Sequence, residues 1–533
     1  MTEGKPTMRY NTSTRASKTV VNNEGARAFA MTPEFELYSA VVTWSLSDTF
    51  YEASDDRGRR IRMLIERCDP VFVGQLAVYV RTTMNMRSVP LQLVAELART
   101  SRGTDLVSQV TNKVIRRADE ITELLACYAL MNGRTSSKKL GRLSKQVQKG
   151  LSMAFNSFDE YQFAKYDRKT SITLRDALFV VHPKPKDVEQ QVLFDKIASG
   201  ELATPYTWET ELSLLGQAPY ETPQARSDAF TAKWEELIES NKLGYMALLR
   251  NLRNIVQAGV SGVHIEKVCS VLADPKKVAQ SKQFPFRFLS AYRELQQLGE
   301  QIDGNTVVDR IFRAITGDRG LVGGVIDALE QAVTASALNV QGFDSETRVL
   351  IACDVSGSMQ TPVSPKSTVN MFDIGLVLGM MLRSRCKRAE IGMFGDTWKV
   401  INVPATNILA NVQAFYAREG EVGYATNGHL VIRDLVKRGV AMDKVMIFTD
   451  CQMWDTSCRG LDIQTAWLTY RRDVAPDARL YLFDLAGHGQ APINLRSDGV
   501  YLIAGWSDKV FDVLTAIDNG GTTLDAIRAI DLN

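Results

Sequence analysis

Apolar residues recur at intervals of three and four along the first three-fifths of the chain. Tyr245, Leu248, Leu252 and Val256 lie on one such stripe, and Arg250 lies opposite it. This spacing predicts an amphipathic helix. Stripes of the same kind predict helices over residues 35–47, 60–66, 71–83, 89–99, 106–117, 120–131, 186–198, 228–240, 263–272, 286–299, 306–316 and 321–338. No convincing strand run separates them, so we expect an all-α region of stacked helix pairs, with HEAT-like repeats as the template.

The pattern changes after residue 344, where short apolar runs alternate with helices. The apolar runs cover residues 349–352, 391–394, 445–448, 480–485 and 501–504, and the clearest helix covers residues 371–386. This alternation predicts a doubly wound α/β domain with a parallel sheet, whose ligands bind beyond the carboxyl ends of the strands. The predicted organisation is a flexible polar leader (1–24), a helical-repeat domain (25–345) and an α/β domain (346–533).

The composition indicates a globular protein but does not predict a binding partner. The chain has 533 residues, 23% charged residues and a formal net charge of +2, which is ordinary for a globular protein of several domains. Its seven cysteines and four histidines show no zinc-ligand spacing, which argues against a thiolate zinc site or a disulfide framework. No signal segment or membrane-length apolar run is visible, so we expect a cytoplasmic protein without membrane contact.

Oxygen-bearing side chains gather where two predicted strands end. Asp354, Ser356 and Ser358 share one turn directly after the strand at 349–353, and Asp450 ends the strand at 445–448. Hard oxygen ligands of this kind suit Mg²⁺ or Mn²⁺, with Asp450 binding directly or through water. The alternative is that Asp354 and Ser356 only cap a helix or a turn. An aspartyl-phosphate phosphatase would need a carboxylate where Ser356 stands, which argues against an enzyme.

Basic residues are concentrated in two segments of the helical region. The segment 134–149 contains six basic residues and no acidic one, and a second cluster follows it closely. Such a patch attracts phosphate, so RNA or another polyanion is the expected partner; a solvated helix face is the alternative. No standard RNA-binding module is recognisable. The candidate RNA-binding residues are Arg134, Lys138, Lys139, Arg142, Lys145, Lys165, Arg168 and Lys169.

The motif at residues 354–358, with Thr449-Asp450 about a hundred residues later, resembles the metal-ion-dependent adhesion site (MIDAS) of the von Willebrand factor A (vWA) domain. In that family a loop threonine completes the site, which the resemblance assigns to Thr426. The family usually has Gly-Gly before this threonine, whereas here Tyr424 and Ala425 precede it.

Several segments in order resemble the Ro autoantigen, or TROVE, family. They are LYSAVVTWSLSDTFY, AKYDRKTSITLRDALFVVHPKP, TWETELS, GYMALLRNLRNIVQAGV and LIACDVSGSM. The resemblance implies a closed ring of HEAT-like helices around a basic hole, with the vWA domain where the ring closes. It places Lys165, Lys169 and His182 at positions that contact small noncoding Y RNA on the outer surface. Pro183 departs from the leucine that often follows this histidine, and a lone histidine at a helix end is otherwise a capping or packing residue.

The function implied by this resemblance is an RNA-binding scaffold in RNA quality control, maturation or decay. Family members also pass the single-stranded 3′ ends of misfolded RNAs through the hole, and bacterial members join a Y RNA to polynucleotide phosphorylase. The competing hypothesis is a metal-dependent protein-interaction module without RNA. A nuclease or aspartyl-phosphate activity is a third possibility, which turnover dependent on Asp354 or Asp450 would reveal.

Overall fold

The structure is a computed structural model, and it describes residues 18–44, 54–101, 103–131, 143–303, 319–337, 343, 346–364, 367–456 and 461–533. The predicted RNA-binding residues Arg134, Lys138, Lys139 and Arg142 lie outside the described residues, as does the helix predicted at 306–316. The chain forms two compact units. The helical unit comprises residues 33–44, 55–210 and 523–533, and the mixed unit comprises residues 1–32, 45–54 and 211–522.

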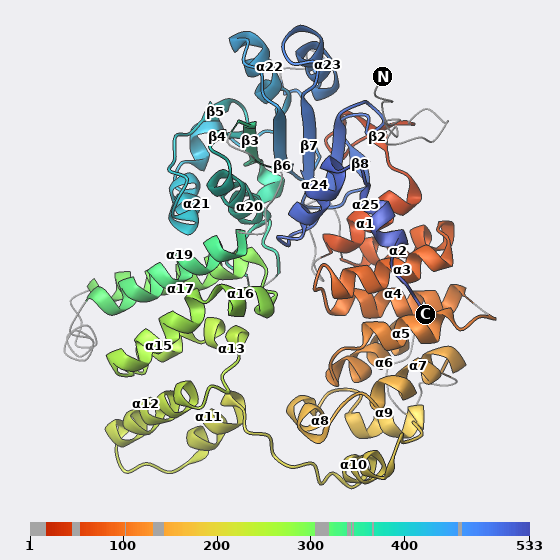
Figure 1. The fold of residues 1–533 in the computed structure, drawn as a ribbon, viewed down its shortest axis with the longest axis vertical. Coiled ribbons are helices and arrows are strands. Elements are labelled where there is room, and N and C mark those ends of the chain that lie inside the picture. The colour runs from red at the N-terminus through yellow and green to blue at the C-terminus, as the bar shows by residue number, and fades with distance from the viewer. Residues whose placement is uncertain are drawn as a thin grey trace, which may run out of the picture. The chain divides into compact units, whose positions relative to one another are not determined.

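The helical unit consists of short helices packed in neighbouring pairs; in Figure 1, α1 to α10 are coloured red to yellow and α25 is blue. Helices α3 and α4, α4 and α6, and α5 and α7 pack directly against each other. Their buried faces are apolar, as the stripes predict. The helices are α1 (Pro33–Val42), α2 (Ser54–Arg67), α3 (Pro70–Thr82), α4 (Ser88–Thr100), α5 (Leu106–Val114), α6 (Asp119–Met131), α7 (Lys145–Phe155), α8 (Glu160–Tyr166), α9 (Leu174–Val181), α10 (Val188–Ser199) and α25 (Thr523–Arg528).

The last residues of the chain pack against this helical unit. The side-chain amide of Gln75 in α3 donates to the carbonyl oxygens of Arg528 (2.7 Å) and Ile530 (3.1 Å). Gly74 lies under the side chain of Leu532, and a Cβ at Gly74 would come within 3.3 Å of it. The C-terminal segment is therefore part of the packing of α3.

The mixed unit begins its helical part at α11, inside which the division between the units falls. The helix predicted across residues 245–256 is wrong as a single helix, because it breaks at Asn251 (φ −103°), whose buried side chain donates to the carbonyl of Ala247. The helices are α11 (Trp208–Gln217), α12 (Pro223–Glu239), α13 (Tyr245–Arg250), α14 (Leu252–Gln257), α15 (Gly262–Ala273), α16 (Pro275–Ser281), α17 (Pro285–Asp303) and α19 (Arg319–Ala337).

A six-stranded sheet follows, in the order β5-β4-β3-β6-β7-β9. The predicted parallel α/β sheet is confirmed, except that the edge strand β5 pairs antiparallel with β4. The strands are β3 (Arg348–Asp354), β4 (Arg388–Phe394), β5 (Trp398–Val400), β6 (Lys444–Thr449), β7 (Arg479–Asp484) and β9 (Val500–Ala504). The helices are α20 (Met371–Arg385), α21 (Ile408–Tyr416), α22 (His429–Arg438), α23 (Ile463–Asp473) and α24 (Val510–Asp518), with 3₁₀ turns η2 (Gly357–Gln360) and η3 (Glu419–Val422).

A small antiparallel sheet corrects the prediction of an unstructured leader over residues 1–24. Strand β1 (Thr19–Val21) pairs with β2 (Arg27–Ala30), which pairs with β8 (Gln490–Ala491). Residues 1–17 lie outside the described part. The hairpin is held at the sheet's carboxyl edge, because the side chain of Asn22 donates to the carbonyl of Met453 (2.9 Å) and the amide of Asn23 donates to the side chain of Gln452 (2.9 Å). Strands of two to four residues are too short to give a periodic signal.

Two polar contacts join the helices before the sheet to those that cover it. Arg293 of α17 donates to both carboxylate oxygens of Asp373 in α20, at 2.8 and 2.6 Å. Glu330 of α19 accepts from the backbone amides of Leu409 and Ala410 at the start of α21, at 3.0 and 2.7 Å. The mixed unit is thus a continuous packed body in which α17 and α19 support α20 and α21.

Candidate metal centre and cationic surface

Three aspartates lie where adjacent parallel strands end at the carboxyl edge of the sheet. Asp354 ends β3, Asp450 follows β6 directly, and Asp484 ends β7. Each side chain is almost completely buried. This edge is the place where a parallel sheet presents its ligand-binding groups. The sequence predicts the first two aspartates; it does not single out Asp484, which lies inside the apolar run predicted at 480–485.

The turn after β3 brings the predicted oxygen ligands together. The backbone amide of Ser356 donates to Asp354 Oδ1 (2.9 Å), and the hydroxyl oxygens of Ser356 and Ser358 lie 3.3 Å apart. Thr449 Oγ1 donates to Asp354 Oδ2 at 2.6 Å. Thr449 belongs to the Thr449-Asp450 part of the sequence motif, but the sequence did not assign it a contact within the site. Its signal was its place beside Asp450, at the end of the strand next to β3.

Asp450 has one carboxylate oxygen without a partner. Its Oδ1 accepts from the amide of Gln452 (3.0 Å), whereas its buried Oδ2 has no hydrogen-bond donor in the described part of the chain. Burial raises the pKa of Asp354, and burial together with the charge of Asp354 raises the pKa of Asp450. A divalent cation would relieve both effects, so this set of oxygens fits the expected Mg²⁺ or Mn²⁺.

The loop that carries Thr426 lies beside this turn. The amide of Gly357 donates to the carbonyl of Tyr424 (3.1 Å), and the side chain of Thr426 is buried. The carbonyl of Thr426 accepts from the amide of Trp454, which follows Asp450 in the chain. Thr426 therefore belongs to the segments around the candidate centre, although within the described part of the chain its hydroxyl makes no hydrogen bond to Asp354 or Asp450.

Two further observations bear on this centre. Cys451, directly after Asp450, has a φ of +63°, a conformation that non-glycine residues hold only where the surroundings enforce it. In the described residues there is no group of three or more His, Cys, Asp or Glu side chains placed to hold a metal. Binding of a cation here would therefore depend on the serine and threonine hydroxyls as well as on the two carboxylates.

The described members of the predicted RNA-binding set lie in α7, in α8 and in the loop between α8 and α9. Lys145, Lys165, Arg168 and Lys169 are exposed, and none has a carboxylate within ion-pair distance among the residues that the structure describes. The ammonium group of Lys165 lies 5.7 Å from the ring centres of both Tyr161 and Tyr166. We call Lys145, Tyr161, Lys165, Tyr166, Arg168, Lys169 and His182 the cationic surface.

His182 ends α9 in a left-handed conformation with an exposed side chain. Its φ is +47°, and its amide donates to the carbonyl of Leu178 (2.9 Å). The loop after it is fixed by Asn156, whose side chain donates to the carbonyl of Lys184 (2.8 Å) and accepts from the amide of Lys186 (2.9 Å). The backbone caps α9, while the imidazole stays available to a ligand.

No helix in the part of the chain that the structure describes is long and apolar enough to span a membrane.

Comparison with known proteins supports this organisation. A TROVE domain model matches residues 193–310 and a Ro60 vWA domain model matches residues 348–517, which together make up more than half of the chain. The cationic surface precedes the residues matched by the TROVE model. The candidate metal centre lies wholly within the Ro60 vWA match.

Individual relatives agree over part or most of the chain. Telomerase protein component 1 is 43% identical in Rattus norvegicus and 42% identical in Mus musculus over 102 residues, which is 19% of this chain and 3% of those proteins. The crystal structure of the Ro (Rsr) protein of Deinococcus radiodurans matches 92% of this chain and 100% of its own, with a TM-score of 0.55 and 19% identity. That likeness shows the Ro fold. The chain therefore belongs to the Ro family, with a TROVE domain followed by a Ro60-type vWA domain.

Proposed function

We propose that this protein is an RNA-binding scaffold that holds small noncoding Y-type RNA on the cationic surface. An RNA-binding role is what membership of the Ro family implies. We further propose that it binds the single-stranded ends of misfolded or structured RNAs, and that it acts in RNA quality control, maturation or decay with an exoribonuclease such as polynucleotide phosphorylase. The ring with a central hole remains a prediction of the sequence.

The observation that carries the RNA proposal is a set of exposed cations that no carboxylate neutralises. Lys165, Arg168 and Lys169 have no such partner among the described residues, whereas Lys196 nearby pairs with Glu160 at 2.7 Å. An unpaired ammonium or guanidinium group can bind a phosphate without first breaking an ion pair. Tyr161, which is 48% exposed, adds an aromatic ring on which an unstacked base can lie, whereas the guanidinium of Arg117 already lies over a face of Tyr166, 4.2 Å from its ring centre.

The test is a double charge reversal, Lys165→Glu with Lys169→Glu. Affinity for a small structured RNA should fall by at least tenfold, and the slope of log affinity against log salt should shrink by about 0.7 for each lost phosphate contact. The matched control is Lys387→Glu with Lys437→Glu, which changes the net charge equally; both lysines are exposed in the α/β region and have no ion-pair partner among the residues that the structure describes. Equal losses in both variants would show only a general charge effect and would refute a localised site.

We also propose a divalent cation held by Asp354, Ser356, Ser358 and Asp450, with Thr426 from the neighbouring loop. The orphaned oxygen of Asp450 favours this proposal. A bound cation would offer an open coordination position that a carboxylate of a partner protein can fill. We assign no catalytic residue, because the hydroxyl of Ser356 stands where a phosphatase needs a second carboxylate. A partner retained by the wild type with Mg²⁺ should be lost with Asp354→Ala.

A further inference from the structure

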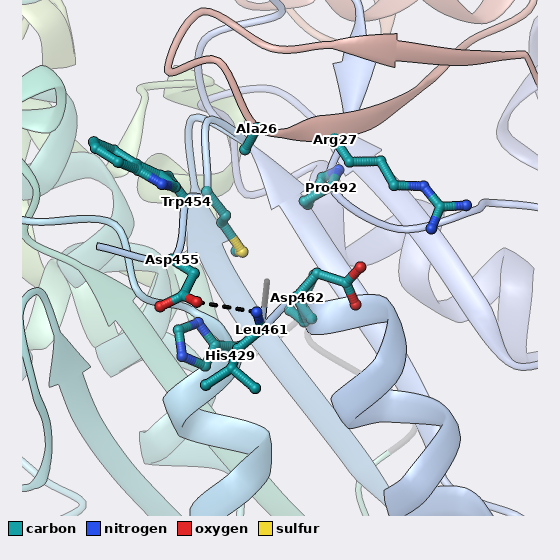
Figure 2. A pocket seen from close by; sticks show the side chains of 10 residues that line it. Ala26, Arg27, His429, Trp454, Asp455, Leu461, Asp462 and Pro492 are labelled. Carbon is teal, nitrogen blue, oxygen red and sulfur yellow. Dashed lines mark hydrogen bonds between the residues drawn. The ribbon is translucent and has the colours of Figure 1, made fainter. Parts of the chain in front are cut away.

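A cavity of about 470 Å³ opens beside the loop that follows Asp450, and it is used neither by the candidate metal centre nor by the cationic surface. Its walls come from the N-terminal hairpin, the loop after β6, the first residues of α22 and α23, and Pro492 (Figure 2). Met453, Leu461 and Ile463 give it an apolar lining. Pockets of this size commonly hold a small ligand or one unit of a polymer.

His429 supplies a largely buried imidazole to the lining of this cavity. Its side chain is 4% exposed, and neither ring nitrogen has a hydrogen-bond partner among the described residues. Figure 2 shows the ring at the cavity, beside the carboxylate of Asp455, which itself accepts from the amide of Leu461 (3.0 Å). Burial lowers the pKa of His429, so the neutral imidazole offers one donor and one acceptor. An imidazole that lines a cavity can bind a ligand through either ring nitrogen, which makes His429 a candidate contact.

The groups around His429 define the chemistry of that ligand. Trp454 is 38% exposed at one side of the cavity and Asp462 lies at the other, while Arg27 is exposed near the opening (Figure 2). Asp455 and Asp462 oppose a simple anion, and Arg27 opposes a simple cation. A nucleotide satisfies all of them, with a base stacked on the indole, an exocyclic amino group donating to a carboxylate, and a phosphate near Arg27.

We propose that this cavity binds one unpaired nucleotide whose base carries an amino group, cytosine or adenine. The proposal rests on the RNA-binding function above and adds a second contact, on the α/β region. Trp454 gives the stacking surface, and His429 and Asp462 read the base edge. Because the loop 450–455 carries both Asp450 and Trp454, a ligand in the pocket also contacts a loop that begins at the candidate metal centre.

The test is calorimetric titration of the full chain with cytidine 5′-monophosphate, and with uridine 5′-monophosphate, which lacks the amino group. Cytidine monophosphate should bind at least fivefold more tightly. Trp454→Ala and His429→Phe should each weaken its binding about tenfold. Leu468→Ala is the matched control, because Leu468 is exposed on α23 and does not line the cavity. His429→Gln replaces His429→Phe if that variant does not fold, as judged by circular dichroism.

Several outcomes would overturn the proposal. These are no binding of cytidine monophosphate at millimolar concentration, equal binding of ribose 5-phosphate, and equal affinity in Trp454→Ala. Tighter binding of L-arginine at the same site would identify a basic protein side chain as the occupant and would also refute it. The titration does not involve the cationic surface, so loss of RNA binding in Lys165→Glu with Lys169→Glu and loss of nucleotide binding in Trp454→Ala are independent results.

Discussion

Asp354 and Asp450 illustrate how a buried pair of carboxylates prepares a cation site. Each is almost completely buried, and the charge of Asp354 contributes to the raised pKa of Asp450. Thr449, Ser356 and Gln452 satisfy three of the four carboxylate oxygens. The fourth, Asp450 Oδ2, has no partner in the described part of the chain. A divalent cation is the species that offsets both the repulsion and the missing contact.

Asp450→Asn should separate this role from ordinary packing. Without metal the variant should melt at a higher temperature than the wild type, because a buried negative charge beside Asp354 is removed. Addition of Mg²⁺ should stabilise the wild type, by about 2.7 kcal/mol at a hundred times the dissociation constant, and should leave the variant unchanged. Thermal unfolding in EDTA and in Mg²⁺ measures both effects. Asp498→Asn, with a side chain that is 98% exposed, is the control; an equal Mg²⁺ response in Asp450→Asn would contradict the site.

His429 should make stability depend on pH. Burial lowers its pKa below the ordinary value of 6.5, Arg433 lowers it further, and Asp455 and Asp462 raise it. The unfolded chain therefore binds more protons, so the stabilising contribution is present above pH 6.5 and is lost as the pH falls through the folded-state pKa. In His429→Gln the free energy of unfolding should vary less between pH 7 and 5, by up to about 1.4 kcal/mol per pH unit. Denaturant titration at several pH values tests this, and an unchanged slope would contradict it.

At the scale of elements, the contact between α17 and α20 should be a strong one. Arg293 and Asp373 form a two-point ion pair whose side chains are 13% and 0% exposed. Removing one partner of such a buried pair leaves an uncompensated charge, so Arg293→Ala should lower the free energy of unfolding by about 3–5 kcal/mol. In the pair between Arg253 and Glu294 each side chain is 40% exposed. Arg253→Ala should therefore lower the free energy of unfolding by less than about 1 kcal/mol. Urea denaturation compares the two, and similar losses would contradict this assignment.

At the scale of the whole molecule, the sequence predicted elements with long patterns and missed those that depend on distant partners. Helices α3 and α6 begin and end within a residue of their stripes, and β3, β6, β7 and β9 coincide with the apolar runs. The hairpin β1–β2 was missed because its partner β8 lies near the other end of the chain.

The same reasoning explains what was predicted of the candidate metal centre. Asp354, Ser356 and Ser358 could be grouped because one turn carries all three. Thr449 and Asp484 could not, because their positions beside the centre follow from the pairing of β6 with β3 and β7, which a single sequence does not show. His429 and Trp454 face one cavity for the same reason. Residues that share one turn can be grouped from the sequence alone, whereas contacts between separate strands and loops can be identified only once the fold is known.

The most direct measurement of RNA binding on the helical unit is ultraviolet cross-linking of the full chain to the RNA that copurifies with it, followed by peptide mapping and RNA sequencing. We expect a defined small RNA, with cross-links to the peptides that contain Tyr161 and Tyr166 and loss of those cross-links in Lys165→Glu with Lys169→Glu. Absence of a copurifying RNA, or cross-links confined to other helices and unchanged in that variant, would contradict the central claim.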